Sequence, residues 1–203
     1  MRLSPVVAVV VTAALASPAA AQGDALDASD AVKFYVAKAD SGEAHPDAEF
    51  AGWALDAWSK ASDGALKFAE TNTESDAVIR IYWAGPSSRK YGEMRGIEVY
   101  GKRGAEVYIN TATDGLGDDV HKRAKRDRLF RDCIVFLTCV HEIGHAVGLS
   151  HTDKFTDIMY SFQYGGEIKK YFLRYRKQVK TRREMSNRSP LSDNDIARLS
   201  ALY

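Results

Sequence analysis

Residues 141–151 of this chain read His141-Glu142-Ile143-Gly144-His145-Ala146-Val147-Gly148-Leu149-Ser150-His151. Histidines four residues apart on a helix share one face, so His141 and His145 can present both imidazoles to one point. Glu142 lies a further step around the helix, close to that point but displaced from it. Gly148 tolerates the left-handed conformation that often ends a helix, which lets the chain turn and bring His151 back. The stretch therefore predicts three imidazoles and one carboxylate around a single point.

Three histidines arranged in this way are typical of a catalytic zinc site. Three protein ligands leave the fourth tetrahedral position open for water, whereas a structural site is closed by a fourth ligand. His141, His145 and His151 are the predicted ligands, and Glu142 is the candidate general base because it can reach a water at that position. The alternative is that these are ordinary core histidines, but this spacing seldom arises by chance.

The 203-residue chain is 45% hydrophobic, which suits one main domain with a sizeable core. Residues 1–21 are predicted to be a secretory signal peptide. Met1-Arg2 gives a positive start, Val6 to Leu15 is too short an apolar run to span a membrane comfortably, and Ala19-Ala20-Ala21 offers a cleavage site. A retained amino-terminal anchor is the alternative. We expect the mature chain, residues 22–203 from Gln22, to be secreted or periplasmic and without a transmembrane segment.

Hydrophobic patterning upstream of the motif predicts a sheet with one long helix. Alternation from Val32 to Val36 indicates a strand, and apolar residues at spacings of three and four from Asp47 to Lys60 indicate an amphipathic helix. Further strands are expected at residues 66–68, 76–83 and 105–110. Residues 85–104 are rich in glycine and charge and predict a long surface loop. The expected fold is α+β, with a twisted mixed sheet packed on the long helix and the active-site helix, and a small C-terminal subdomain.

Two cysteines, Cys133 and Cys139, lie just before the motif. If the active-site helix begins near Asp132, they point to different faces and lie roughly 9 Å apart along its axis. That separation is beyond the reach of a disulfide, so two buried free thiols are favoured. A bridge, which an oxidising compartment would permit, requires Cys133 to lie outside the helix.

The motif and the residues after it resemble the metzincin signature, and the matrixin family in particular. Asp157-Ile158-Met159-Tyr160 is similar to the Met-turn of that clan, and Ser192 to Leu199 is similar to the last matrixin helix. Ser192 can cap this helix, and the acidic residues that follow suit its positive end. The resemblance covers nearly all of the mature chain, although only residues 140–160 are specific. It implies the three histidines as zinc ligands, Glu142 as general base and Met159 as hydrophobic support beneath the metal.

Several details depend on the resemblance or depart from it. The substrate pocket of such an enzyme would be walled by the residues just after Met159, which here are Ser161, Phe162, Gln163 and Tyr164. Tyr160 directly follows the methionine, so the tyrosine ligand of astacin-like and serralysin-like enzymes is not implied. There is no room for a propeptide and no cysteine before the first strand, so we do not expect the thiol latch of vertebrate matrixins.

Other metal sites have little support in the sequence. His45 and His121 are too few and too far apart to suggest a second, structural zinc. Asp114, Asp118 and Asp119 among glycines could hold Ca²⁺, although a solvated acidic loop is the more common outcome for such a run.

Basic residues concentrate on both sides of the motif. Six Lys or Arg occur in residues 121–131, and the segment from Glu167 to Arg188 holds nine against two Glu, a net charge of +7 in a chain whose total is +1. Ile168, Phe172, Tyr175 and Val179 are spaced as on an amphipathic helix. This basic insertion could dock to an anionic surface or an acidic protein. Alternatively it packs against the domain with a solvated charged face. Nucleic acid is not an expected partner for an exported protein.

The sequence thus predicts an exported zinc-dependent endopeptidase that acts on proteins or peptides. Zinc would polarise the scissile carbonyl while Glu142 takes a proton from the attacking water and later gives it to the leaving amine. One alternative is an exported binding protein that uses its basic helix and keeps zinc for structure only, but such a protein would not need Glu142. Another is a gluzincin with a distant glutamate ligand, against which Gly148 and His151 argue.

Overall fold

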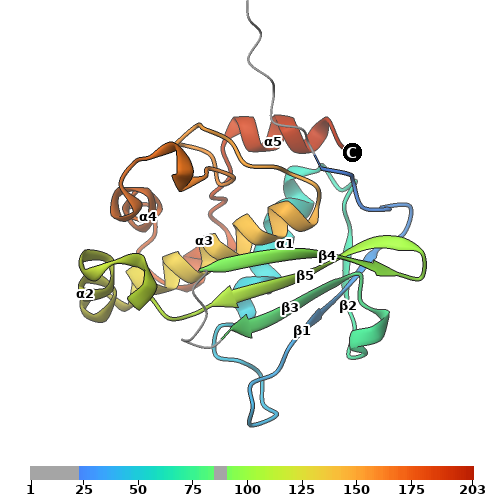
Figure 1. Cartoon of the computed structure of the whole chain (residues 1–203), viewed down its shortest axis with the longest axis horizontal. Helices are drawn as coiled ribbons and strands as arrows, with labels where there is room; N and C mark the ends of the chain where they lie inside the picture. Colours follow the sequence, from blue (N-terminus) through green and yellow to red (C-terminus); the bar gives the residue numbers. More distant parts are fainter. Residues whose placement is uncertain (1–22, 85–90) are drawn as a thin grey trace, which may run out of the picture.

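A five-stranded mixed sheet forms one layer of the fold (Figure 1). The computed structural model describes residues 23–84 and 91–203, and the predicted signal peptide lies outside the described residues. The strands are β1 Val32–Val36, β2 Phe68–Glu70, β3 Ile79–Ala84, β4 Gly92–Val99 and β5 Lys102–Asn110. Their order is β2-β1-β3-β5-β4, and all neighbours are parallel except β4 and β5. The expected α+β fold with a mixed sheet is confirmed.

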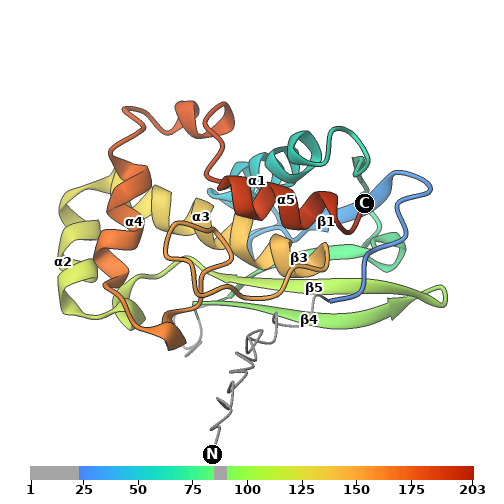
Figure 2. The ribbon, with the colours of Figure 1, turned by 90° about the horizontal axis from the view of Figure 1, so that it is seen from above.

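The helices cover one face of this sheet (Figure 2). They are α1 Ala48–Ala61, α2 Asp118–Arg126, α3 Arg128–Ala146, α4 Ile168–Arg176 and α5 Asp193–Ser200, and four 3₁₀ turns occupy Glu74–Asp76, Asp114–Leu116, Phe162–Tyr164 and Arg183–Ser186. No helix in the described part of the chain is long and apolar enough to cross a bilayer.

Strand β4 corrects one expectation. Residues 85–104 were expected to form a surface loop. Residues 85–90 of this stretch lie outside the described residues, but Gly92–Val99 pairs along its whole length with β5. As an edge strand with several exposed residues, β4 carries charges and glycines that look like a loop in the sequence. The hairpin turn at Tyr100 and Gly101 has φ of 52° and 74°, the left-handed pair that suits the twist of a two-residue turn. Backbone pairing with β5 therefore makes residues 92–99 a strand, although their local sequence is typical of a loop.

Helix α3 runs through the core, packed between the sheet and α1. Ile109 of β5 and Phe50 of α1 are fully buried, as are Phe136 and Ile143 of α3. The indole of Trp58 in α1 donates a hydrogen bond to the Val140 carbonyl at 2.9 Å, which satisfies the one polar atom of this buried ring. A helix that is apolar nearly all round can keep polar side chains only where they have partners.

The start of α3 settles the state of the cysteines. The helix begins at Arg128, where Asp127 caps it by accepting from the Phe130 amide. Cys133 and Cys139 both lie within it, buried and free. Burial raises the pKa of the Cys133 thiol to about 12 and raises that of Cys139 further. Neither thiol is therefore a reactive group.

The basic insertion packs against the domain. Within it, Ile168–Arg176 forms the only α-helix, and Phe172, Tyr175 and Val179 are buried as the amphipathic pattern predicted. The Arg176 guanidinium contacts the Asp127 carboxylate at 3.1 Å, between the helix and the cap of α3. Part of the positive charge of this segment is thus used to hold it on the domain.

A buried ion-pair cluster ties the insertion to α1 and α3. Asp47 is 2% exposed and accepts two hydrogen bonds from Arg131, at 2.6 and 2.7 Å. Burial opposes ionisation of this carboxyl, but the hydrogen bonds and charge of Arg131 hold its pKa below the ordinary value of 3.8. Arg182 of the insertion approaches both Asp47 and Asp132, and its guanidinium lies 4.1 Å from the centre of the Phe50 ring.

Replacing Asp47 tests how much this cluster stabilises the fold. Asp47→Ala leaves the Arg131 guanidinium partly buried without its main partner and removes one carboxylate from Arg182, so the free energy of unfolding should fall by about 3 kcal/mol. Asp56→Ala is the matched control, because it breaks an exposed pair with Lys60 on the same helix and should change stability by less than about 0.5 kcal/mol. Denaturant unfolding of both variants measures the difference, and equal effects would contradict a structural role for the cluster.

Candidate metal centre

The end of α3 determines where the third histidine lies. The helix ends at Ala146, and Gly148 follows with φ of 102°, a conformation that strains any residue with a side chain. The Leu149 amide donates to the Gly144 carbonyl at 2.9 Å, and the Gly148 amide donates to the His145 carbonyl at 3.0 Å. These two bonds form a Schellman motif, which satisfies the last carbonyls of the helix and reverses the chain. The predicted turn at Gly148 is confirmed.

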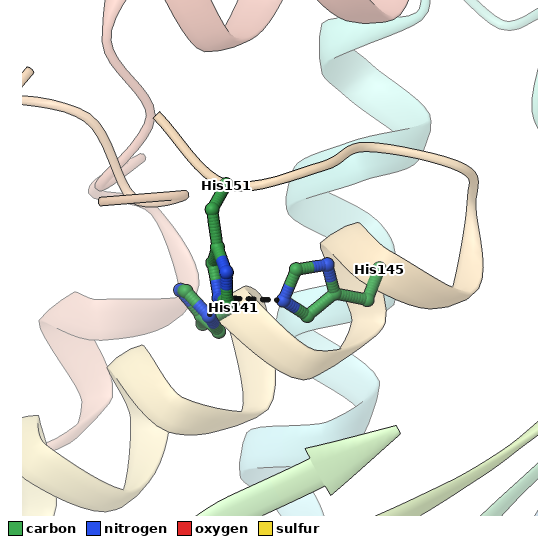
Figure 3. A group of neighbouring side chains, drawn as sticks. All are labelled: His141, His145 and His151. Atoms are coloured by element: carbon green, nitrogen blue, oxygen red, sulfur yellow. Dashed lines mark hydrogen bonds between the residues drawn. The ribbon is translucent and has the colours of Figure 1, made fainter. Parts of the chain in front are cut away.

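The three histidine rings meet at one point (Figure 3). His141 and His145 project from α3, and His151 approaches them from the loop. The Nε2 atom of His151 lies 3.2 Å from that of His141 and 3.1 Å from that of His145. The ring atoms on the other side have separate partners, since His141 Nδ1 lies 2.7 Å from the Ile158 carbonyl and His145 Nδ1 lies 2.7 Å from the Leu149 carbonyl.

These contacts determine the state of two rings. A carbonyl oxygen can only accept, so Nδ1 of His141 and of His145 carries a proton and Nε2 keeps its lone pair. Burial lowers the pKa of His141 to about 3 and that of His145 to about 4, and burial also lowers the pKa of His151. The rings are therefore neutral at pH 7, the form in which imidazole binds a metal.

The donor set fits a zinc ion. Tetrahedral nitrogen ligands at about 2.0–2.1 Å from a metal lie about 3.4 Å apart, close to the observed spacing of the Nε2 atoms. The Nε2 lone pairs of His141 and His145 face the ring of His151, and a cation at the shared point would bind these lone pairs and relieve their repulsion. Within residues 23–84 and 91–203, these histidines are the only group of three or more His, Cys, Asp or Glu placed to hold a metal ion.

The aspartates considered for calcium lie elsewhere. Asp114, Asp118 and Asp119 are exposed, and the latter two occupy the first turn of α2. Negative charge there suits the positive end of the helix dipole, which accounts for their position without an ion. Calcium binding remains a prediction.

The Ile158 carbonyl is shared between the first histidine and the basic insertion. Besides His141, it accepts a hydrogen bond from the phenol of Tyr171 at 3.0 Å. Tyr171 is buried in α4, and Arg174 one turn further on donates to the Asp157 carbonyl at 3.0 Å. The insertion therefore holds the backbone that orients a predicted metal ligand.

Helix α5 also holds this turn. The buried carboxylate of Asp195 accepts from the amides of Ile158 at 2.8 Å and Met159 at 3.3 Å. It also accepts from the Ser192 amide, which together with the bond from the Asp195 amide to the Ser192 hydroxyl completes a capping box at the start of α5. Burial raises the pKa of Asp195 despite these bonds. The sequence suggested only the helix-end role of Asp195, because its contact with the turn spans 37 residues.

Met159 lies directly against α3. It is fully buried, and a side chain at Gly144 would collide with its sulfur and with the indole of Trp58. Gly144 lies between the two ligand histidines of the helix, so its lack of a side chain lets the turn approach the site. The phenol of Tyr160 donates to the Gly165 carbonyl at 2.8 Å, so its hydroxyl is bound to the backbone and not to the histidines.

Glu142 lies at the wall of a cavity beside the histidines. The residue is 7% exposed, and a side chain at Gly92, the first residue of β4, would collide with its carboxylate. Edge strand β4 therefore begins directly at the predicted general base. Glycine is required at this position for the backbone to come so close.

The cavity has a volume of about 280 Å³ and a mostly apolar lining. Of the four residues predicted to wall a substrate pocket, Ser161 and Phe162 line it, whereas Gln163 and Tyr164 are exposed and do not. Besides two of the histidines and Glu142, the cavity has seven lining residues that sequence reasoning missed: Tyr91, Gly92, Leu137, Thr138, Tyr160, Tyr171 and Phe172. The amphipathic pattern of the insertion marked Phe172 as buried, but nothing local placed it beside the metal site.

Comparisons with known proteins agree with this geometry. The family model for matrixins matches residues 29–176, which is more than half of the chain and includes all three histidines and Met159. A solved structure, described as the GM1-bound form of the ECX AB5 holotoxin, is similar in fold, with a TM-score of 0.54 and 12% identity over 89% of this chain and 87% of that one. No curated protein matches the sequence. The family match and the three converging histidines within it lead to one conclusion: the chain belongs to the matrixin family.

Proposed function

We propose that this matrixin is an exported zinc-dependent endopeptidase. The observation that carries the proposal is the convergence of three neutral imidazoles beside a cavity that Glu142 also lines. His141, His145 and His151 would hold the ion through Nε2, with Met159 packed beneath them. A zinc ion held there would act as a Lewis acid that polarises the scissile carbonyl and lowers the pKa of water.

Glu142 would carry the proton through the reaction. Its carboxylate takes a proton from water as the water oxygen bonds to the carbonyl carbon, and it delivers that proton to the leaving nitrogen as the carbon–nitrogen bond breaks. A carboxylate that is nearly enclosed by protein has few competing waters, which favours a defined proton path. An exported binding protein with a structural metal would have no use for such a carboxylate at the cavity wall.

An extended peptide would bind beside β4. This strand is the edge of the sheet and its first residue, Gly92, lies beside Glu142, so its outer edge can pair with the backbone of a substrate. One substrate side chain would then enter the apolar cavity lined by Leu137, Phe162 and Phe172.

Replacing Glu142 tests the mechanism. Glu142→Ala should lower kcat by about 10²–10⁴-fold because the proton acceptor is lost. Zinc content should stay at about one ion per chain, because the three histidine ligands are unchanged. The measurements are cleavage of an unstructured protein and metal analysis of the purified variant. Glu43→Ala, which changes an exposed loop carboxylate, should behave as the unchanged protein. A chelator should abolish cleavage and zinc should restore it. Full activity of Glu142→Ala would refute this role.

Removing one phenol tests the support of the metal site. Tyr171→Phe deletes the hydroxyl that holds the Ile158 carbonyl, so zinc affinity should fall by roughly tenfold. Tyr175→Phe is the matched control on the same helix, since that phenol donates to the Arg188 carbonyl and touches no predicted ligand. Competition with a chromophoric chelator measures both affinities. Equal zinc affinity in the two variants would show that Tyr171 does not support the site.

Export rests on residues 1–21. If they are a signal peptide, the chain recovered from the secreted or periplasmic fraction of an exporting host should begin at Gln22. Intact mass determination identifies the first residue. Recovery of the uncleaved chain from the membrane fraction would favour the retained anchor.

Docking of the basic insertion to an anionic surface or an acidic protein also remains a prediction. Arg174, Arg176 and Arg182 hold the insertion on the domain. The exposed side chains of Lys177 and Lys180 are among those left for such a contact.

A further inference from the structure

A strongly basic hollow lies between α2 and α4, apart from the metal site. Its volume is about 630 Å³, and five of its seven lining residues are basic: Lys122, Arg123, Arg126, Arg128 and Lys169. The two acidic ones are Asp119 and Asp127. Most of these cations come from the basic run that precedes the motif, for which the peptidase mechanism gives no role. An unassigned concentration of charge in a concave surface indicates a ligand of opposite charge.

The acidic residues do not neutralise the hollow. Asp127 already pairs with Arg123 at 2.9 Å and with Arg176 at 3.1 Å, and it caps α3 as well. Within the described part of the chain, no ion pair involves Arg126, Arg128 or Lys169. Neighbouring cations repel one another, and an anion between them would relieve that repulsion. The hollow therefore suits a partner with more than one negative charge.

The hollow and the cavity beside the histidines share two helices, α3 and α4. Lys169 precedes Phe172, which lines the cavity, by one turn of α4, and Arg128 precedes Leu137 of the cavity wall by nine residues on α3. Nine residues of helix span about 13 Å. Both ribbon views show α2 beside α4 at the end of the molecule where α3 begins (Figures 1 and 2). A chain that leaves the cavity toward this end reaches the basic side chains.

The position of Glu142 indicates which half of a cleaved substrate would extend from the cavity toward the hollow. Glu142 lines the cavity together with His141 and His151, whereas His145 does not. Since Glu142 would give its proton to the leaving amine, the residue that supplies that amine would lie on the cavity side of the three histidines. The residues that follow it in the substrate would then continue toward α4 and α2. They belong to the carboxyl side of the cleaved bond.

We propose that the hollow between α2 and α4 is a subsite for acidic residues on the carboxyl side of the cleaved bond. The proposal rests on the peptidase function and adds a substrate class to it. At about 3.3 Å per residue, an extended chain crosses 13 Å in about four residues. Acidic side chains at the fourth to sixth positions after the cleaved bond would therefore reach Arg126, Arg128 and Lys169.

The test compares peptides that share one cleaved core. A peptide library first supplies the core, and its absence would refute the peptidase function itself instead of the subsite. The core is then extended so that positions four to six after the bond are acidic, neutral or basic. At low ionic strength the acidic tail should raise kcat/KM roughly fivefold to tenfold over the neutral one, mainly through KM, as expected for two or three exposed charge contacts. About 0.5 M salt should remove this advantage.

Charge-reversal variants test whether the preference for an acidic tail depends on the residues that line the hollow. Arg126→Glu with Arg128→Glu should abolish the preference for the acidic tail, while cleavage of the untailed core stays within about twofold. Lys125→Glu with Lys177→Glu changes the charge equally at exposed residues that do not line the hollow, and it should keep the preference. Lys169→Glu alone should reduce the preference in part, which provides a second variant if the double replacement folds poorly.

Two results would overturn the proposal. One is cleavage of the core with no advantage for the acidic tail. The other is an advantage that survives Arg126→Glu with Arg128→Glu. Binding to phosphatidylserine vesicles is measured alongside. If that binding depends on Arg126 and Arg128 while the tail has no effect, the hollow is a membrane contact and not a substrate subsite.

Discussion

The three histidine side chains lie in a largely apolar interior, where their ring nitrogens need hydrogen-bond partners. Several distant segments of the chain hold the backbone carbonyls that serve as these partners. His141 and His145 donate from Nδ1 to the carbonyls of Ile158 and Leu149, which leaves Nε2 free toward the shared point. An unpaired polar group in the interior costs about 1–3 kcal/mol, so each of these carbonyls has to be held in place. The turn after α3 and the Met-turn provide them.

Distant segments of the chain hold the two turns. Gly148 allows the reversal after α3, and Asp195 of α5 accepts from the amide of Ile158. The phenol of Tyr171 reaches the same peptide unit from the basic insertion. The insertion is in turn fastened by Arg182 and Asp47 to the start of α1. The segment that looked like an accessory helix in the sequence is thus part of the support of the predicted metal site.

Charge in this protein is used in two different ways. Buried or half-buried guanidinium groups such as Arg131 and Arg182 join separate elements through Asp47 and Asp132, where desolvation makes each bond costly to break. Exposed cations such as Arg126 and Arg128 have no ion-pair partner in the described part of the chain and gather around a hollow. The sequence shows both groups only as an excess of Lys and Arg. Their different roles follow from burial.

Local patterns determined much of this protein. The spacing of His141, His145 and His151 predicted their convergence, because a helix places residues four apart on one face and Gly148 ends it. Alternation and helical periodicity also predicted β1 and α1, since both have one buried face. Only the tertiary structure decided that residues 92–99 form an edge strand, that Ser161 and Phe162 but not Gln163 and Tyr164 line the cavity, and that Tyr171 and Asp195 hold the Met-turn. These outcomes depend on contacts between residues far apart in the chain, which no local pattern encodes.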